Sequence, residues 1–140
     1  MSALRISMDP GEFDLTMIHR YLSEESYWAK GLSKPLLERA MAHSICFGGF
    51  VDEAQVAFAR VVSDRATFAH LKDVFVLQPF RGRGYGVALV RAIVSHPELQ
   101  AVTMTLATAD AHELYRRFGF GTHSQPERQM IRAGTFLDAS

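Results

Sequence analysis

The residues best suited to chemistry gather first in a glycine-rich segment of the second half of the chain. Its sequence is Arg81-Gly82-Arg83-Gly84-Tyr85-Gly86, with a glycine at every second position. Apolar residues at helical spacing follow from Val87 onward, which predicts that the segment opens a helix. Glycines at a helix start leave backbone N–H groups free for a ligand, and the helix dipole favours an anion there. With two arginines in the segment, we expect it to bind a phosphate or a pyrophosphate.

The spacing of these glycines argues against two common phosphate sites. The dinucleotide fingerprint G-x-G-x-x-G needs a third glycine where Val87 or Leu89 stands. The P-loop needs a lysine and a hydroxyl residue directly after its last glycine, and neither follows Gly86. The pattern that fits is Arg-x-x-Gly-x-Gly, formed by Arg81, Gly84 and Gly86.

A second pattern follows in the last third of the chain, Ala111-His112-Glu113-Leu114-Tyr115-Arg116-Arg117-Phe118-Gly119-Phe120. It resembles the A-x-x-L-Y-x-x-x-G-F signature of the GNAT acetyltransferase superfamily, and the glycine-rich segment resembles the acetyl-CoA loop of the same superfamily. The two patterns occur in the order that the family has them. The resemblance carries motifs over residues 44–122.

The resemblance implies that the chain binds acetyl-CoA and transfers the acetyl group directly to a primary amine, without a covalent enzyme intermediate. It places the pyrophosphate on the loop and the pantetheine arm on the strand before it. Thr108 stands where family members often carry an asparagine that helps to hold the coenzyme. The residues implied for coenzyme binding are Phe75, Val76, Leu77, Arg81, Gly82, Arg83, Gly84, Tyr85, Gly86, Val87, Thr108 and Tyr115.

Tyr115 is the first candidate for a catalytic side chain. The thiolate that leaves acetyl-CoA needs a proton, and a phenol with an ordinary pKa of about 10 can supply one. Tyr115 matches the position of the general acid in the family. Spacing alone favours another interpretation, because Tyr115 shares a helical face with Leu114 and Phe118 and could be a core aromatic residue.

Asp73 is the second candidate, because the attacking ammonium must lose a proton and a carboxylate could accept it directly or through water. It precedes Phe75 on the strand that the resemblance assigns to the thioester. A structural pairing with Lys72 or with an arginine is an equally good interpretation of this carboxylate.

The acceptor is not identified by the sequence. The first two helices of this fold and the link between them usually wall the acceptor pocket, and here the link contains Tyr27 and Trp28. Aromatic rings beside Glu24 and Glu25 could receive a cationic amine, or Tyr27 and Trp28 could pack the two helices together. A non-catalytic module that binds acetyl-CoA for sensing is the alternative function; it would need the loop but not Tyr115.

Composition supports one globular domain over residues 1–140, with 48% hydrophobic and 21% charged residues. Fifteen basic and fifteen acidic residues give no net charge, which speaks against nucleic acid or a membrane as a partner. Without a long apolar segment or a signal-peptide pattern, we expect a cytoplasmic protein. The histidines lack metal-ligand spacing, so no metal is expected. A homodimer through a strand or helix edge stays open.

The elements that would position these residues indicate an α/β (α+β) fold. Strands are expected over residues 4–8, 44–51, 54–62, 67–77 and 101–107, and Asp14 and Asp110 have the residue type of helix N-caps. Short turns connect the earlier strands, and a helix separates the last two. This order predicts a GNAT-like mixed central sheet, antiparallel in its N-terminal part with a parallel central pair, and flanked by about four helices. Residues 120–123 and 127–133 are expected to form a final hairpin.

Overall fold

A mixed sheet organises the protein in the computed structural model, which describes residues 3–137. Its strands lie in the order in which they occur in the chain, and neighbouring strands are antiparallel except for the last pair. The prediction of a mixed sheet, antiparallel first and then parallel, is confirmed. The strands are β1 (Arg5–Ser7), β2 (Ile45–Val51), β3 (Ala54–Ser63), β4 (Phe68–Val76) and β5 (Thr103–Thr105).

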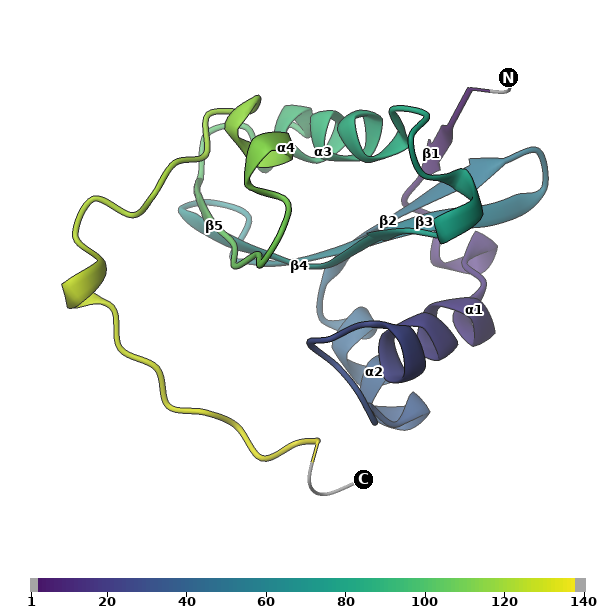
Figure 1. Cartoon of the computed structure of the whole chain (residues 1–140), viewed down its shortest axis with the longest axis horizontal. Coiled ribbons are helices and arrows are strands. Elements are labelled where there is room, and N and C mark those ends of the chain that lie inside the picture. The colour runs from purple at the N-terminus through teal and green to yellow at the C-terminus, as the bar shows by residue number, and fades with distance from the viewer. Residues whose placement is uncertain (1–2, 138–140) are drawn as a thin grey trace.

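Helices cover both faces of the sheet (Figure 1). On one face lie α1 (Leu15–Arg20), which continues into the π-helical turn η2 (Tyr21–Glu25), and α2 (Lys34–Ala42). On the other face lie α3 (Tyr85–Ser95) and α4 (His112–Arg116). Short 3-10 turns complete the chain at η1 (Pro10–Glu12), η3 (Gln78–Phe80) and η4 (Pro126–Arg128). The predicted cap at Asp14 is present, because its carboxylate accepts the Met17 N–H at 3.1 Å.

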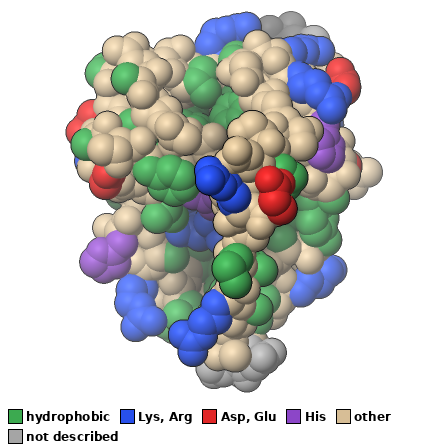
Figure 2. Space-filling model, turned by 90° about the vertical axis from the view of Figure 1, so that its left-hand side faces the viewer, with side chains coloured by type: hydrophobic (Ala, Val, Ile, Leu, Met, Phe, Trp, Pro, Cys, Tyr) green, Lys and Arg blue, Asp and Glu red, His purple; other side chains and the backbone are tan. Residues whose placement is uncertain are grey.

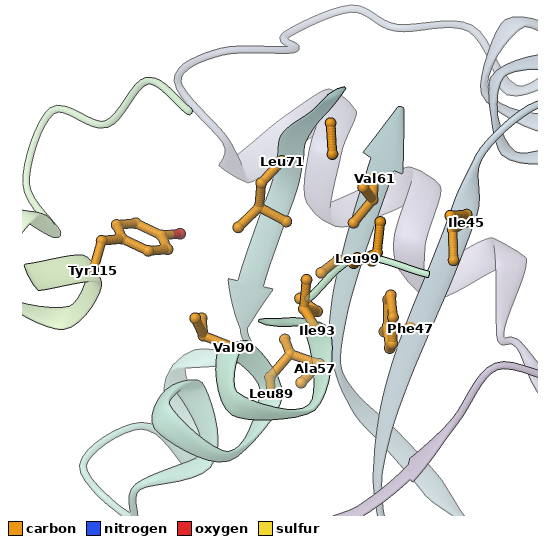
Figure 3. Packing of buried hydrophobic residues seen from close by; sticks show 12 residues of the cluster. Ile45, Phe47, Ala57, Val61, Leu71, Leu89, Val90, Ile93, Leu99 and Tyr115 are labelled. Carbon is orange, nitrogen blue, oxygen red and sulfur yellow. The ribbon is translucent and has the colours of Figure 1, made fainter. Parts of the chain in front are cut away.

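Each face of the sheet carries its own apolar core. The core beneath α3 and α4 includes Phe47, Val61 and Leu89, all at most 1% exposed, and is shown in Figure 3. The core beneath α1 and α2 is built around Ile18 and Phe58. Burial alternates along β4, as expected for a strand whose two faces pack against different helices. The sheet therefore holds two helical layers in fixed positions on either side of β4.

The last two strands separate after a short parallel ladder. Only Phe68, Ala69 and His70 of β4 pair with β5, at Thr103, Met104 and Thr105. Residues 71–76 continue β4 without a partner on that side. Asp73 has a positive φ of 55°, and the register between β3 and β4 shifts opposite it, between Phe58 and Arg60. This bulge turns β4 where the two strands part, and the opening between them lies beside it.

Two local predictions were wrong. Residues 117–137 form no strand, so the expected hairpin over 120–123 and 127–133 is absent. Figure 1 shows this C-terminal arm (residues 121–137) passing beside the sheet toward the side of α2. Met130 and Ile131 are 97% and 92% exposed, and neighbours in an extended chain point to opposite sides, so the arm offers no single apolar face to bury. Asp110 is not the cap of α4, which has Ala111 at that position.

Candidate active site

The glycine-rich loop has the backbone geometry of an anion site. Gly82 and Gly84 have φ values of 78° and 81°, which glycine adopts without the strain that a Cβ brings. Gly84 is the N-cap of α3, and its carbonyl accepts the first intrahelical bond, from the Ala88 N–H at 3.0 Å. The N–H groups of the first helical turn, Gly86 and Val87 among them, have no acceptor within the helix. They can therefore bind an anion.

The two arginines of the loop have different surroundings. Arg81 donates from Nε to the Val76 carbonyl at 2.9 Å and from a terminal nitrogen to the Tyr21 hydroxyl at 3.0 Å. It thereby fastens the loop to the end of β4 and to η2. Arg83 is exposed and stands over the Phe80 ring, 5.3 Å from its centroid. Within residues 3–137 it makes no hydrogen bond or ion pair, so its charge is available to a ligand.

The opening between β4 and β5 is a cavity of about 350 Å³, which we call the β4–β5 cleft. The separated part of β4 forms one wall and residues 106–111 form the other. Tyr115 closes the cleft from α4, and Figure 3 shows its hydroxyl pointing toward the strand that carries Leu71. Residues 70–74 of β4 and the Tyr115 side chain therefore line the same space.

Tyr115 is 7% exposed, and its ring packs edge-on against Phe120. Its hydroxyl has no hydrogen-bond partner among the residues that the structure describes. Burial, and then the nearby Tyr27 and Asp110, raise the pKa of Tyr115 to about 12. The side chain is therefore both a core aromatic and a neutral hydrogen-bond donor facing the cleft, which unites the two interpretations left open by its spacing.

Asp73 lines the cleft and is 7% exposed. One of its oxygens accepts from Trp28 Nε1 at 2.8 Å, and the other accepts from Arg60 Nε at 2.8 Å. The guanidinium of Arg60 also donates to the Ser44 hydroxyl at 3.1 Å. Asp73 is thus paired with an arginine, one of its two expected interpretations. A carboxylate offers about four acceptor positions, so two remain for a further donor.

A second cavity of about 420 Å³ lies on the side of Asp73 that faces α2, and we call it the α2 cavity. It shares three lining residues with the β4–β5 cleft, namely Trp28, Lys72 and Asp73. The two cavities therefore adjoin each other around Asp73, Lys72 and Trp28. The other lining residues of the α2 cavity are Ala29, Leu32, Leu36, Leu37, Arg39, Ala40, His43, Ser44, Arg60, Val62 and Phe136.

The two aromatic residues of the helical link line the site as well. Trp28 borders both cavities, and the ring of Tyr27 contacts it edge-on at 5.0 Å. The Tyr27 hydroxyl accepts the Ala109 N–H at 3.0 Å, which ties the link to the far wall of the cleft. Glu24 and Glu25 are exposed and line neither cavity. Tyr27 and Trp28 therefore line these cavities while Glu24 and Glu25 do not, and an acceptor-binding role for the two aromatic residues stays a prediction.

Of the remaining coenzyme candidates, Thr108 lines the cleft and Phe75, Val76 and Leu77 do not, and some of their polar groups are already engaged. The Thr108 hydroxyl accepts the Ala111 N–H at 3.0 Å and so supports the start of α4. The Leu77 N–H donates to the Val56 carbonyl at 2.8 Å. Phe75 points away from the cleft and stacks on Tyr21, with ring centroids 3.9 Å apart. Contacts from these residues to pantetheine would involve their remaining backbone or hydroxyl groups.

Arg60 and Ser44 were not singled out from the sequence. The available signal was a charged residue inside the apolar run of β3, where an unpaired guanidinium is costly and so needs a partner. Nothing in residues 3–137 brings three His, Cys, Asp or Glu side chains together as a metal site. The expectation that the protein needs no metal stays a prediction. Among these same residues, no helix is long and apolar enough to cross a membrane.

Comparison with known proteins now identifies the family. A family model described as an acetyltransferase (GNAT) domain matches residues 42–122. A crystal structure of a protein from Xanthomonas campestris, assigned to the GNAT acetyltransferases, is 50% identical and has a TM-score of 0.94, over 100% of this chain and 99% of its own. A protein of Gibberella zeae assigned as an acetyltransferase is 28% identical over 81% of this chain and 77% of its own length. A GNAT-family protein of Streptococcus pneumoniae, 22% identical with a TM-score of 0.71 over 96% of this chain and 98% of its own, shares the fold.

The chain therefore belongs to the GNAT acetyltransferase family. Members of this family transfer an acetyl group from acetyl-CoA, so the protein is an acyltransferase. The sequence-based assignment to this family is confirmed. Which acceptor receives the acetyl group, and which residues carry the reaction, follow from neither the family nor the fold.

Proposed function

We propose that the protein transfers the acetyl group of acetyl-CoA to a primary amine of a small-molecule or peptide acceptor by direct attack, within a single domain of residues 1–140. The observation that carries this proposal is the meeting of two cavities at Asp73. One cavity, the β4–β5 cleft, has the tyrosine and the separated strand that a thioester needs. The other cavity adjoins Asp73 but is otherwise lined by different residues, several of them from α2, so an acceptor there would approach without displacing the coenzyme.

Acetyl-CoA binding would use the loop and the separated strand. The pyrophosphate lies against the N–H groups at the start of α3, with the Arg83 charge beside it, as the geometry of residues 81–87 supports. The pantetheine arm runs along the part of β4 that β5 leaves unpaired, which is the end nearest Phe75, Val76 and Leu77. The coenzyme would then lie along one continuous segment of the chain, from the loop back along β4 to the cleft.

The reaction forms a bond between the acceptor nitrogen and the acetyl carbon and breaks the bond between that carbon and sulfur. Negative charge builds on the carbonyl oxygen and then on sulfur. A backbone N–H of the separated strand stabilises the oxygen, since donors fixed before the reaction cost no reorganisation. The Tyr115 hydroxyl donates to the departing sulfur; its pKa of about 12 keeps it protonated throughout the neutral range.

Asp73 supports the loss of the ammonium proton in this proposal. The amine approaches from the α2 cavity, and its N–H is received by an acceptor position that Trp28 and Arg60 leave open on the carboxylate. The proton passes from there to solvent, directly or through a water molecule. Because both oxygens already accept hydrogen bonds, Asp73 also fixes the position of Trp28 at the junction of the two cavities.

Replacement of Tyr115 by phenylalanine tests the role of the hydroxyl. The ring packing is retained, so the expected result is a fall in kcat of roughly 100-fold, the usual contribution of a positioned acid, with the Kd for CoA almost unchanged. Turnover would be followed by thiol release and CoA binding by calorimetry. Wild-type turnover in Tyr115→Phe would remove Tyr115 from the mechanism.

A further inference from the structure

The charges that line the α2 cavity are unbalanced. Its lining contains three basic side chains, Arg39, Arg60 and Lys72, and one acidic side chain, Asp73. The ion pair between Arg60 and Asp73, 2.8 Å from nitrogen to oxygen, cancels one charge of each sign. Within residues 3–137, Arg39 and Lys72 make no hydrogen bond or ion pair. The cavity therefore keeps two uncompensated positive charges, with His43 at its rim.

Lys72 is half-buried, but its ammonium, which has no partner within residues 3–137, stays accessible to a ligand. Its field is felt by His70, which lies on the same strand. The pKa of His70 is lowered first by burial and then by the positive charges of Lys72 and Arg60. The positive charges of Lys72 and Arg60 thus act on the cleft side of β4 as well.

These cations are not placed to serve the coenzyme phosphates. The glycine-rich loop starts α3, which covers the opposite face of the sheet from α2 (Figure 1). No residue of 81–87 lines the α2 cavity. Figure 2 shows the side of the molecule along which the arm runs, and its lower part carries Lys and Arg side chains with no Asp or Glu in view. A volume of about 420 Å³ suits a small ligand.

We propose that the acceptor is a small amine that also carries an anionic group, a carboxylate or a phosphate, bound by Lys72, Arg39 and the remaining N–H groups of Arg60. This proposal rests on the proposed function, because it names the acceptor class of that same site. Arg60 has five N–H donors and uses only those toward Asp73 and Ser44 within residues 3–137, so it can still donate to an anion.

The arrangement also explains how the amine becomes reactive. An anion held by Lys72 and Arg39 leaves the amine end free to reach Asp73, where the β4–β5 cleft begins. The Asp73 carboxylate can then receive the ammonium proton, which leaves the neutral amine that attacks the thioester. The site thus selects an acceptor by its anionic end and deprotonates it at its other end.

Three acceptors of similar length test the proposal: propylamine, 3-aminopropanoate and 2-aminoethyl phosphate. With acetyl-CoA, the expected kcat/KM for at least one anionic acceptor is roughly tenfold or more above that for propylamine, the usual worth of one charged hydrogen bond. The two anionic acceptors distinguish a carboxylate site from a phosphate site. Lys72→Met and Arg39→Met should each lower, several-fold, the ratio of kcat/KM for the anionic acceptor to kcat/KM for propylamine. Lys34→Met, on the same helix as Arg39 but outside the cavity, should leave the ratio unchanged.

Propylamine used as well as both anionic acceptors would overturn the anion site and leave acetyl transfer to amines intact. An unchanged ratio in both Lys72→Met and Arg39→Met would also overturn it. If the wild type acetylates none of the three, the proposed transfer to amines is at fault. Binding then decides the anion site alone: in CoA-saturated protein, N-acetyl-3-aminopropanoate or 2-acetamidoethyl phosphate should raise Tm more than N-propylacetamide. Equal effects of all three would overturn the inference.

Discussion

Replacement of Gly86 by alanine separates the folding role of the loop from its ligand-binding role. Gly86 is the second residue of α3 and lies outside the positive-φ region. A Cβ added there would lie 3.7 Å from a Leu114 methyl carbon, an ordinary contact distance. Alanine in place of glycine stabilises a helix by roughly 0.5–1 kcal/mol, so Tm should rise by roughly 2–5 °C. Gly84, by contrast, has a φ of 81° and would be strained by any substitution.

The same methyl group should weaken coenzyme binding. A pyrophosphate bound to the first-turn N–H groups approaches the backbone at Gly86, and a Cβ there costs at least one charged hydrogen bond. Such a bond is worth roughly 1.5–3 kcal/mol, or about 10- to 100-fold in Kd. Calorimetric titration with CoA, together with thermal melts, measures both effects. Gly121→Ala, at an exposed glycine with open space around it, is the control. A Gly86→Ala protein that is more stable and binds CoA like the wild type would refute the phosphate site at this loop.

Three further predictions concern buried groups. Asp73→Asn keeps a residue that tolerates a positive φ but removes the ion pair of Arg60, whose side chain is 13% exposed. The free energy of unfolding, measured in urea, should therefore fall by roughly 3–5 kcal/mol, and adding Arg60→Met should restore part of it. Additive losses in the double variant would contradict the pairing. Burial raises the pKa of Cys46 to about 11, so its alkylation by iodoacetamide at pH 8 should be at least about 100-fold slower than that of a free cysteine peptide, and a comparable rate would show that the thiol is accessible. The pKa of Tyr115 is about 10 in the unfolded chain and about 12 in the folded protein, so the hydroxyl's contribution to the free energy of unfolding is complete below pH 10 and is lost as pH rises toward 12. Over that range the wild type should therefore lose stability relative to Tyr115→Phe. A constant difference between the two proteins would argue against the raised pKa.

The sequence was informative where function depends on short spacings. The loop and the Tyr115 helix are local patterns, and their residues need only a few neighbours to adopt the predicted conformation. The order of strands and helices likewise followed from turn lengths and from one crossover, which leave few topologies for a chain of this size.

The parts that could not be predicted depend on distant residues. The network of Trp28, Ser44, Arg60 and Asp73 joins the helical link, the end of α2, β3 and β4, and no spacing relates these positions. The bulge at Asp73 shifts the pairing register of β4, so a strict two-residue period of side-chain direction could not show that Lys72 and Asp73 line the same cavity.

The hairpin failed for a related reason. Gln125 and Pro126 gave a turn signal, but a turn forms a hairpin only if the strands on either side can bury a face. Met130 and Ile131 are neighbours and remain exposed along the arm. Local turn chemistry was present there without the long-range packing that would make use of it.

The most direct test of acetyl transfer is a product analysis. Protein, acetyl-CoA and an amine acceptor are incubated together, and released thiol and acetylated acceptor are quantified by absorbance and mass spectrometry. The account predicts one acetyl group on the acceptor nitrogen for each thiol released, and a roughly 100-fold fall in the rate of both in Tyr115→Phe. Thiol release without acetylated amine, or acetylated amine formed as fast by Tyr115→Phe as by the wild type, would contradict it.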